Sequence, residues 1–172
     1  YLGDLNDVAW GGWGNDRLFG QAGNDALHGS KGDDLIDGGG GIDVLIGGEG
    51  ADTLVGGAGA DKLTGESGAD IFSGTAASLS GDTITDFAAG DRLVITDASL
   101  ANFTHSLSGS TLTYSGGSLI LTGASTGTLV ASAAAGGGVQ LMLSNSPPPP
   151  PLSRAMLVLT EAGQDLSIGG DV

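Results

Sequence analysis

One aspartate stands at every ninth position through the first part of the chain, without a slip. The series is Asp16, Asp25, Asp34, Asp43, Asp52, Asp61 and Asp70. Carboxylate oxygens are ligands for hard cations, and they suit such ions better than they suit Zn²⁺ or Cu²⁺. The chemistry to be explained is therefore a regular series of acidic oxygen ligands.

The aspartates belong to seven consecutive blocks of nine residues. The blocks are GGWGNDRLF, GQAGNDALH, GSKGDDLID, GGGGIDVLI, GGEGADTLV, GGAGADKLT and GESGADIFS, over residues 11–73. With block positions numbered one to nine, position four is always glycine, position six aspartate and position eight a large apolar residue. A degenerate copy, residues 2–10, precedes them and keeps Asp7. A flexible linker has no reason to keep three residue types in phase.

Each block is expected to contain a turn and a short strand. Positions seven to nine place one apolar residue between two tolerant neighbours, which is the period-two pattern of a strand. Positions one to six form the turn, where glycine permits positive φ and lets carbonyl oxygens converge. A strand with one apolar residue must stack on others to bury a shared column. Two blocks per coil place block n beside block n+2, so the sequence predicts a parallel β-roll with Ca²⁺ between turns one coil apart.

The charge balance agrees with several bound ions. Residues 1–73 carry thirteen acidic and three basic side chains, a net charge of −10. Seven turns paired in this way form five sites, and five Ca²⁺ ions would neutralise that charge. Without metal, aspartate repulsion and the entropy of the glycine-rich backbone oppose folding. We therefore expect folding and the binding of about five or more Ca²⁺ ions to be one event.

Composition excludes other classes of function. The 172 residues have a net charge of −15, with only five Lys and Arg. Nucleic acids and anionic membranes attract basic patches, so neither is an expected partner. The chain has no cysteine, which excludes a disulfide framework and a Cys-ligated zinc site. No stretch approaches the ~18 apolar residues of a membrane-spanning helix.

The blocks resemble the RTX nonapeptide G-G-x-G-x-D-x-U-x, closely over residues 11–73 and loosely over 2–10. The resemblance implies that carbonyls of the glycine turn and the position-six aspartate bind Ca²⁺. The implied ligand residues are Gly12, Gly14, Asp16, Gly23, Asp25, Gly32, Asp34, Gly39, Gly41, Asp43, Gly48, Gly50, Asp52, Gly57, Gly59, Asp61, Gly68 and Asp70. Gln21, Ser30 and Glu66 depart from glycine at position two, where positive φ would be less comfortable.

After Ser73 the glycine–aspartate rhythm gives way to Ser, Thr and aliphatic residues. The segment D-T-I-T-D-F, residues 82–87, resembles the D-x-I-x-D-F flank of serralysin-type proteases and other RTX exoproteins. Asp82 and Asp86 could bind a further Ca²⁺ or cap a turn. Six strands, with a hairpin at residues 115–118, are expected to form an antiparallel β-sandwich-like cap. They are 93–96, 103–107, 111–114, 119–122, 128–131 and 139–143.

The expected domains are a β-roll (1–73), the capping region (74–146), and a polyproline spacer with a terminal strand segment (147–172). The chain begins within a repeat pattern, which indicates a fragment of a longer protein. Trp10 and Trp13, beside the first turn, are expected to be capping hydrophobic residues, with a ligand platform as the alternative.

No catalytic residue is expected. Residues 123–127 fit G-x-S-x-G, but this hydrolase motif needs a following helix and a later histidine. His28 and His105 both come earlier, and there is no H-E-x-x-H motif.

The overall prediction is an all-β, non-catalytic module that folds with calcium in a type I-secreted extracellular bacterial protein. Its partners would be Ca²⁺, the rest of the parent protein and the type I secretion apparatus. The parent would be an exoenzyme such as a protease or lipase, or alternatively a surface-layer protein or adhesin.

Overall fold

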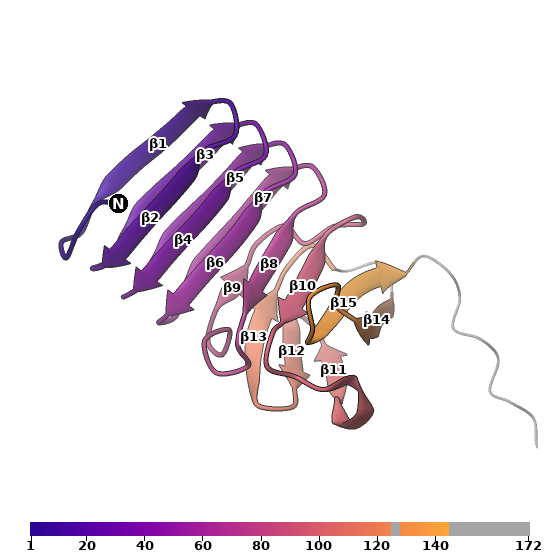
Figure 1. Ribbon diagram of the computed structural model, residues 1–172. Coiled ribbons are helices and arrows are strands. Elements are labelled where there is room, and N and C mark those ends of the chain that lie inside the picture. Colours follow the sequence, from indigo (N-terminus) through magenta and orange to yellow (C-terminus); the bar gives the residue numbers. More distant parts are fainter. Residues whose placement is uncertain (125–127, 145–172) are drawn as a thin grey trace, which may run out of the picture.

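The computed structural model describes residues 1–124 and 128–144, which form two facing β-sheets (Figure 1). Within these ranges there is one 3₁₀ turn, η1 (Leu100–Asn102), and no helix long and apolar enough to cross a membrane. The strands are β1 (Val8–Trp13), β2 (Arg17–Ala22), β3 (Ala26–Lys31), β4 (Leu35–Gly40), β5 (Val44–Glu49), β6 (Thr53–Ala58), β7 (Lys62–Ser67), β8 (Ile71–Gly74), β9 (Thr83–Ile84), β10 (Arg92–Ile95), β11 (His105–Ser108), β12 (Thr111–Tyr114), β13 (Gly117–Leu121), β14 (Thr128–Ala133) and β15 (Val139–Ser144).

The first eight strands alternate between the two sheets and form a parallel β-roll. Strands β1, β3, β5 and β7 are neighbours in one sheet, and β2, β4, β6 and β8 are neighbours in the other. Paired residues lie 18 positions apart, as in the pairs Leu27↔Leu45 and Ile36↔Leu54. The register confirms the predicted coil of two blocks, with block n beside block n+2.

The turns are shorter than the sequence predicted. Strands β2 to β7 each have six residues, namely positions seven to nine of one block and positions one to three of the next. Only positions four to six form the turn, so the prediction of a six-residue turn is wrong. Position one belongs to a strand, and it requires glycine because other atoms already fill the space where a side chain would lie. A Cβ on Gly38, for example, would collide with the Asp43 carboxylate and the Gly56 carbonyl.

The position-eight residues form the predicted buried column. The side chains of six of them are at most 1% exposed, namely Leu27, Ile36, Leu45, Leu54, Leu63 and Phe72. Leu18 is only half-buried, because it lies in the first coil and has no full coil before it. Burying one such side chain contributes about 1.5–3 kcal/mol, so the column is a main source of stability for the roll.

The flank continues the same two sheets. After β8 the spacing between paired residues increases to 21, because the turn over residues 75–81 is longer. Strand β9 pairs in parallel with β7, and β10 pairs in parallel with β8. Strand β13 then pairs in parallel with β9, and β12 and β11 follow, each antiparallel to its neighbour. In the other sheet β15 pairs antiparallel with β10, and β14 pairs antiparallel with β15.

All six strands predicted after residue 90 are present, with ends shifted by a few residues. The predicted hairpin joins β12 to β13, but its two linking residues are Ser115 and Gly116, since Tyr114 pairs with Gly117. Gly116 has a φ of 108°, which explains the need for glycine there. The flank buries Ile84, Phe87 and Leu93 in the core that it shares with the roll.

The two tryptophans do not cap the roll. Trp10 is 67% exposed and Trp13 is 87% exposed, so the prediction of capping hydrophobic residues is wrong. Trp10 is a position-nine residue on the outer face of β1. Trp13 is near the Lys31 ammonium, which lies 5.4 Å from its ring centroid. Ser125 of the G-x-S-x-G segment, and the polyproline spacer with its terminal strand segment (147–172), lie outside the described residues.

Candidate metal centre

The position-six aspartates form two rows that run along the stack of coils, one at each set of turns. One row is Asp7, Asp25, Asp43, Asp61 and Asp82, and the other is Asp16, Asp34, Asp52, Asp70 and Asp91. In every neighbouring pair, Oδ1 of the later aspartate accepts the backbone N–H of the earlier one at 2.7–3.1 Å. All members from Asp25 onwards are at most 3% exposed.

The second carboxylate oxygen of most of these aspartates has no hydrogen-bond donor. In the described part of the chain, Oδ2 is buried and unpartnered in Asp7, Asp16, Asp25, Asp34, Asp43, Asp52, Asp61 and Asp82. A buried polar atom without a partner costs about 1–3 kcal/mol, and more when it is charged. Eight such atoms would offset most of the ~5–15 kcal/mol by which domains are stable. A row of buried, unpaired anionic oxygens therefore fits a hard cation.

Backbone carbonyls lie beside these oxygens. Asp16 Oδ2 and the Gly29 carbonyl oxygen are each 2.7 Å from the point where a Cβ on Gly11 would lie. The same pairing, one carboxylate oxygen and one carbonyl oxygen from the next coil, recurs beside Gly20, Gly29 and Gly38. Oxygen atoms of two consecutive coils thus converge on a space that only glycine leaves open.

Position four shows the same convergence from the other side of the turn. A Cβ on Gly59 would collide with the Gly41 carbonyl oxygen and would lie 3.2 Å from Asp61 Oδ1. Gly68, Gly50 and Asp70 repeat this arrangement in the other row, where the last distance is 3.4 Å. A position-four carbonyl of one coil therefore lies close to the position-six carboxylate of the next.

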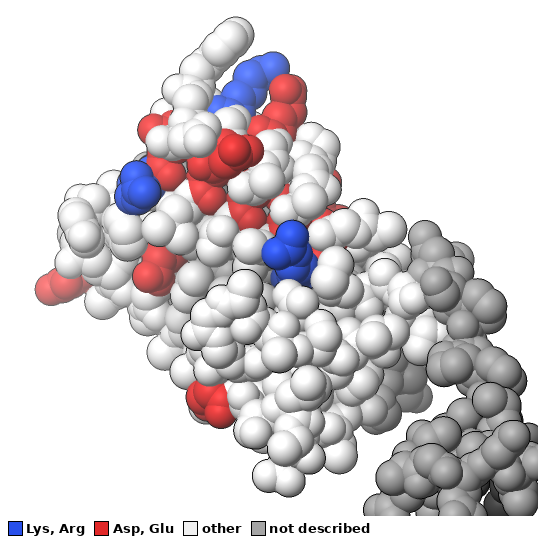
Figure 2. All heavy atoms as spheres, turned by 45° about the vertical axis from the view of Figure 1, so that its right-hand side comes forward, with Lys and Arg blue, Asp and Glu red and all other residues white. Residues whose placement is uncertain are grey.

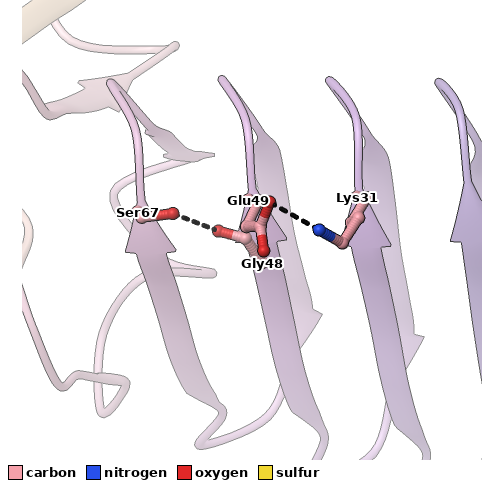
Figure 3. Close-up of polar contacts among 4 residues, drawn as sticks. All are labelled: Lys31, Gly48, Glu49 and Ser67. Atoms are coloured by element: carbon pink, nitrogen blue, oxygen red, sulfur yellow. Dashed lines mark hydrogen bonds and ion pairs between the residues drawn. The ribbon is translucent and has the colours of Figure 1, made fainter.

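Position-two carbonyls also lie along the stack. Those of Gln21, Ser30 and Gly39 approach the position-two glycine of the following coil so closely that a Cβ there would collide. The Gly48 carbonyl accepts a long hydrogen bond, 3.5 Å, from Ser67 Oγ (Figure 3). In the same row of side chains, Lys31 and Glu49 form an exposed ion pair at 3.0 Å.

The backbone has positive φ at positions two and four. At the predicted glycines of these positions φ lies between 101° and 152°. The three departures from glycine share this conformation, with φ of 82° at Gln21, 88° at Ser30 and 68° at Glu66. The expected conflict between sequence and backbone is therefore present at all three residues.

Burial makes the charged form of five of these aspartates unfavourable. It raises the pKa of Asp52 to about 6, with a further contribution from Asp70 and Asp34 in the same row. Burial likewise raises the pKa of Asp82 to about 7, although the hydrogen bond from Asp61 acts in the opposite direction. Burial also raises the pKa values of Asp43, Asp61 and Asp70.

Figure 2 shows that most acidic atoms visible on this face lie toward the repeats, whereas the flank is mostly uncharged.

Side chains alone do not form a metal site in the described residues, since no three His, Asp or Glu residues gather around one point. The two carboxylates of neighbouring coils would have to be completed by backbone carbonyls. This fits Ca²⁺, which takes six to eight oxygen ligands and accepts carbonyls readily.

Sequence reasoning missed part of this arrangement. Asp91 was not predicted to belong to a row. For Asp82, calcium binding was only one of two predicted roles, the other being to cap a turn. Their signal is the D-x-U spacing of Asp82-Thr83-Ile84 and Asp91-Arg92-Leu93, displaced by three residues from the phase of the repeats. Asp86 does cap backbone, because its two oxygens accept the N–H groups of Gly65 and Glu66 at 3.0 and 2.7 Å.

A second ladder, at position five, was also missed. Side-chain oxygens of Asn or Asp accept the backbone N–H of the residue 18 positions later. The acceptors are Asn6, Asn15, Asn24 and Asp33. The signal was the Asn or Asp at position five in the early blocks only.

Comparison with protein families agrees with this geometry. Residues 6–45 and 46–77 match the family of RTX calcium-binding nonapeptide repeats, in four copies. Residues 6–77 are RTX repeats. Their role is to bind calcium and to form a β-roll, and they are a structural rather than a catalytic element. The D-x-I-x-D-F segment lies outside the RTX match. Comparison with curated proteins gave no match.

Proposed function

We propose that this chain is a module that folds when it binds calcium, and that it stabilises a type I-secreted extracellular bacterial protein. The observation that carries the proposal is the set of eight buried Oδ2 atoms without a donor. These atoms lie within or next to RTX repeats, whose family role is calcium binding.

The ligands that we propose are the position-six carboxylates with the carbonyls of positions two and four, as named from the sequence. Bound Ca²⁺ would supply the positive charge that the buried carboxylates lack. The Oδ1 atoms hold successive coils in register through the backbone N–H groups that they accept, which leaves Oδ2 for the ion. The glycines keep the space beside each carboxylate free of side chains.

Without the ion, the rows oppose folding. Neighbouring coils are about 4.8 Å apart, and two unit charges at that distance repel by about 3–4 kcal/mol at an effective dielectric constant of 20. The 34 glycines add a large entropic cost of ordering. Calcium concentration would then control whether the roll is folded, unfolded in a calcium-poor cytosol and folded outside the cell.

We further propose that the roll (1–73) and the capping region (74–146) form the C-terminal part of an exoenzyme such as a protease or lipase. The resemblance of residues 82–87 to the serralysin-type flank supports this parent class. The module itself would contribute stability and export competence, with the catalytic residues elsewhere in the parent.

Far-UV circular dichroism during a titration from EGTA to excess calcium tests the coupling of folding to binding. We expect little secondary structure in EGTA and a cooperative gain of β signal with Ca²⁺. Mg²⁺ should substitute poorly, because it demands octahedral geometry and dehydrates reluctantly. A repeat region that is fully folded in EGTA would refute the proposal.

A further inference from the structure

The two aspartate rows end differently in the flank. Asp82 ends one row and Asp91 ends the other, and both lie beyond the matched RTX residues. The Oδ1 atoms behave alike, since Asp82 accepts the N–H of Asp61 at 2.9 Å and Asp91 accepts that of Asp70 at 3.1 Å. Both side chains are buried, at 1% and 3% exposure. The flank thus provides one further carboxylate for each row.

The Oδ2 atoms of these two residues differ. Oδ2 of Asp91 accepts the backbone N–H of Ala88 at 2.8 Å, within its own turn. Oδ2 of Asp82 is buried and has no donor among the described residues. The terminal carboxylate of one row is therefore completed by protein, and that of the other row is not.

The turn before Asp82 explains why no amide reaches its Oδ2. The N–H of Gly81 donates to the Ser118 carbonyl at 2.8 Å, and the N–H of Asp82 donates to the Leu79 carbonyl at 3.4 Å. The nearby Tyr114 hydroxyl donates to the Ala76 carbonyl at 3.1 Å. These donors are used elsewhere, so the local structure offers Asp82 no equivalent of the Ala88 amide.

No basic side chain compensates Asp82 either. Within residues 1–124 and 128–144, the single ion pair joins Lys31 to Glu49, far along the roll. The neighbour of Asp82 in its row, Asp61, also has a buried Oδ2 without a donor. Two consecutive carboxylates, held one coil apart by the Asp61 N–H, thus present unpaired oxygens at the junction between the repeats and the flank.

We propose that Asp82 is a ligand of a further Ca²⁺ ion at this junction, and that Asp91 ends its row without an ion. The inference rests on the proposed calcium binding of the rows. The Ala88 N–H takes the place at Asp91 that an ion takes at Asp82. The two rows consequently hold unequal numbers of ions, and one ion joins the repeats to the flank.

The test compares Asp82→Asn with Asp91→Asn in the full chain. Each change removes one buried charge and keeps an oxygen that can accept the N–H of the preceding coil. Native mass spectrometry at saturating calcium counts the bound ions, and calorimetric titration gives an independent stoichiometry. We expect one Ca²⁺ fewer than wild type in D82N and the wild-type number in D91N.

A wild-type number of ions in D82N, or an equal loss in both variants, would overturn the inference. Failure of D82N alone to fold at saturating calcium would support it, because Asp82 Oδ2 has no hydrogen-bond donor to lose, and only a bound cation would make its charge necessary. Failure of both variants to fold would overturn the asymmetry. A wild-type chain that binds no Ca²⁺ would instead refute the proposed function itself.

Discussion

Removing the flank should abolish cooperative calcium binding, although every repeat block remains. In a chain ending at Ser73, the fully buried Leu63 and Phe72 lose the Ile84 and Leu93 residues that pair beside them in the next coil. If about half of each of the two side chains becomes exposed, the loss is about 1.5–3 kcal/mol.

The same truncation removes hydrogen bonds from the last coil. The carbonyls of Asp61 and Asp70 lose the N–H donors of Thr83 and Arg92, both at 2.8 Å. Their own N–H groups lose carboxylate acceptors in the flank. At about 1 kcal/mol for each neutral bond and about 1.5–3 kcal/mol for each bond to a carboxylate, the total loss reaches about 7–11 kcal/mol. This is comparable to the whole stability of a typical domain.

Calorimetric titration and circular dichroism of chain 1–73 beside the full chain measure the effect. We expect weak, non-cooperative binding and little secondary structure, whereas simple chelation predicts unchanged binding. Deletion of residues 1–10 is the matched control, because it removes the degenerate copy at the exposed end of the roll. That variant should keep its cooperativity. If the chain ending at Ser73 binds cooperatively with the wild-type midpoint, the flank does not act as a folding cap.

Three further predictions concern the turns. Asp43→Ala should raise the calcium midpoint severalfold, since it affects the sites on both sides of it, whereas Asp7→Ala at the end of the row should have a much smaller effect; equal shifts would contradict a nearest-neighbour roll. Gly59→Ala should destabilise more than Gly14→Ala in calcium melting curves, because both residues have positive φ but only at Gly59 would a Cβ meet the carbonyl of the preceding coil; similar melting temperatures would argue against the close approach. Without calcium, β structure should increase as the pH falls from 8 to 5. The reason is that burial raises the pKa of Asp82 from 3.8 to about 7. The protonated Asp82 side chain therefore favours the folded state fully below its unfolded pKa, and this stabilisation is lost as the pH rises through its folded pKa. A dichroism signal independent of pH, with light scattering to detect aggregation, would contradict this.

The sequence predicted the roll well because each block carries its own signals. The aspartate phase and the apolar residue at position eight are both local, and together they determine the coil of 18 residues and the buried column. The predicted turn length was wrong because glycine has two physical uses that look alike in a sequence. Glycine can allow positive φ, as it does at position two, or it can leave space for a carboxylate, as Gly38 at position one does beside Asp43.

The end of the rows was harder to predict because it depends on non-local geometry. The three additional residues before Asp82 shift Asp82 and Asp91 out of phase, although each still precedes an apolar residue by two positions. Whether a carboxylate there is completed by an amide depends on the turn that precedes it. The N–H of Ala88 and the N–H of Gly81 cannot be distinguished in this respect from residue type.

The compactness of each coil has a mechanical consequence. Eighteen residues span at most about 60 Å when fully extended, yet one coil lengthens the roll by only about 4.8 Å. Completing a coil therefore draws in about 55 Å of chain. If, under the type I secretion proposed above, the flank leaves the cell before the repeats, the roll would fold coil by coil on the outer side. Each coil closed by calcium would pull the next 18 residues outward, and the two-sheet roll would be too wide to slide back. Extracellular calcium would then make the transfer directional.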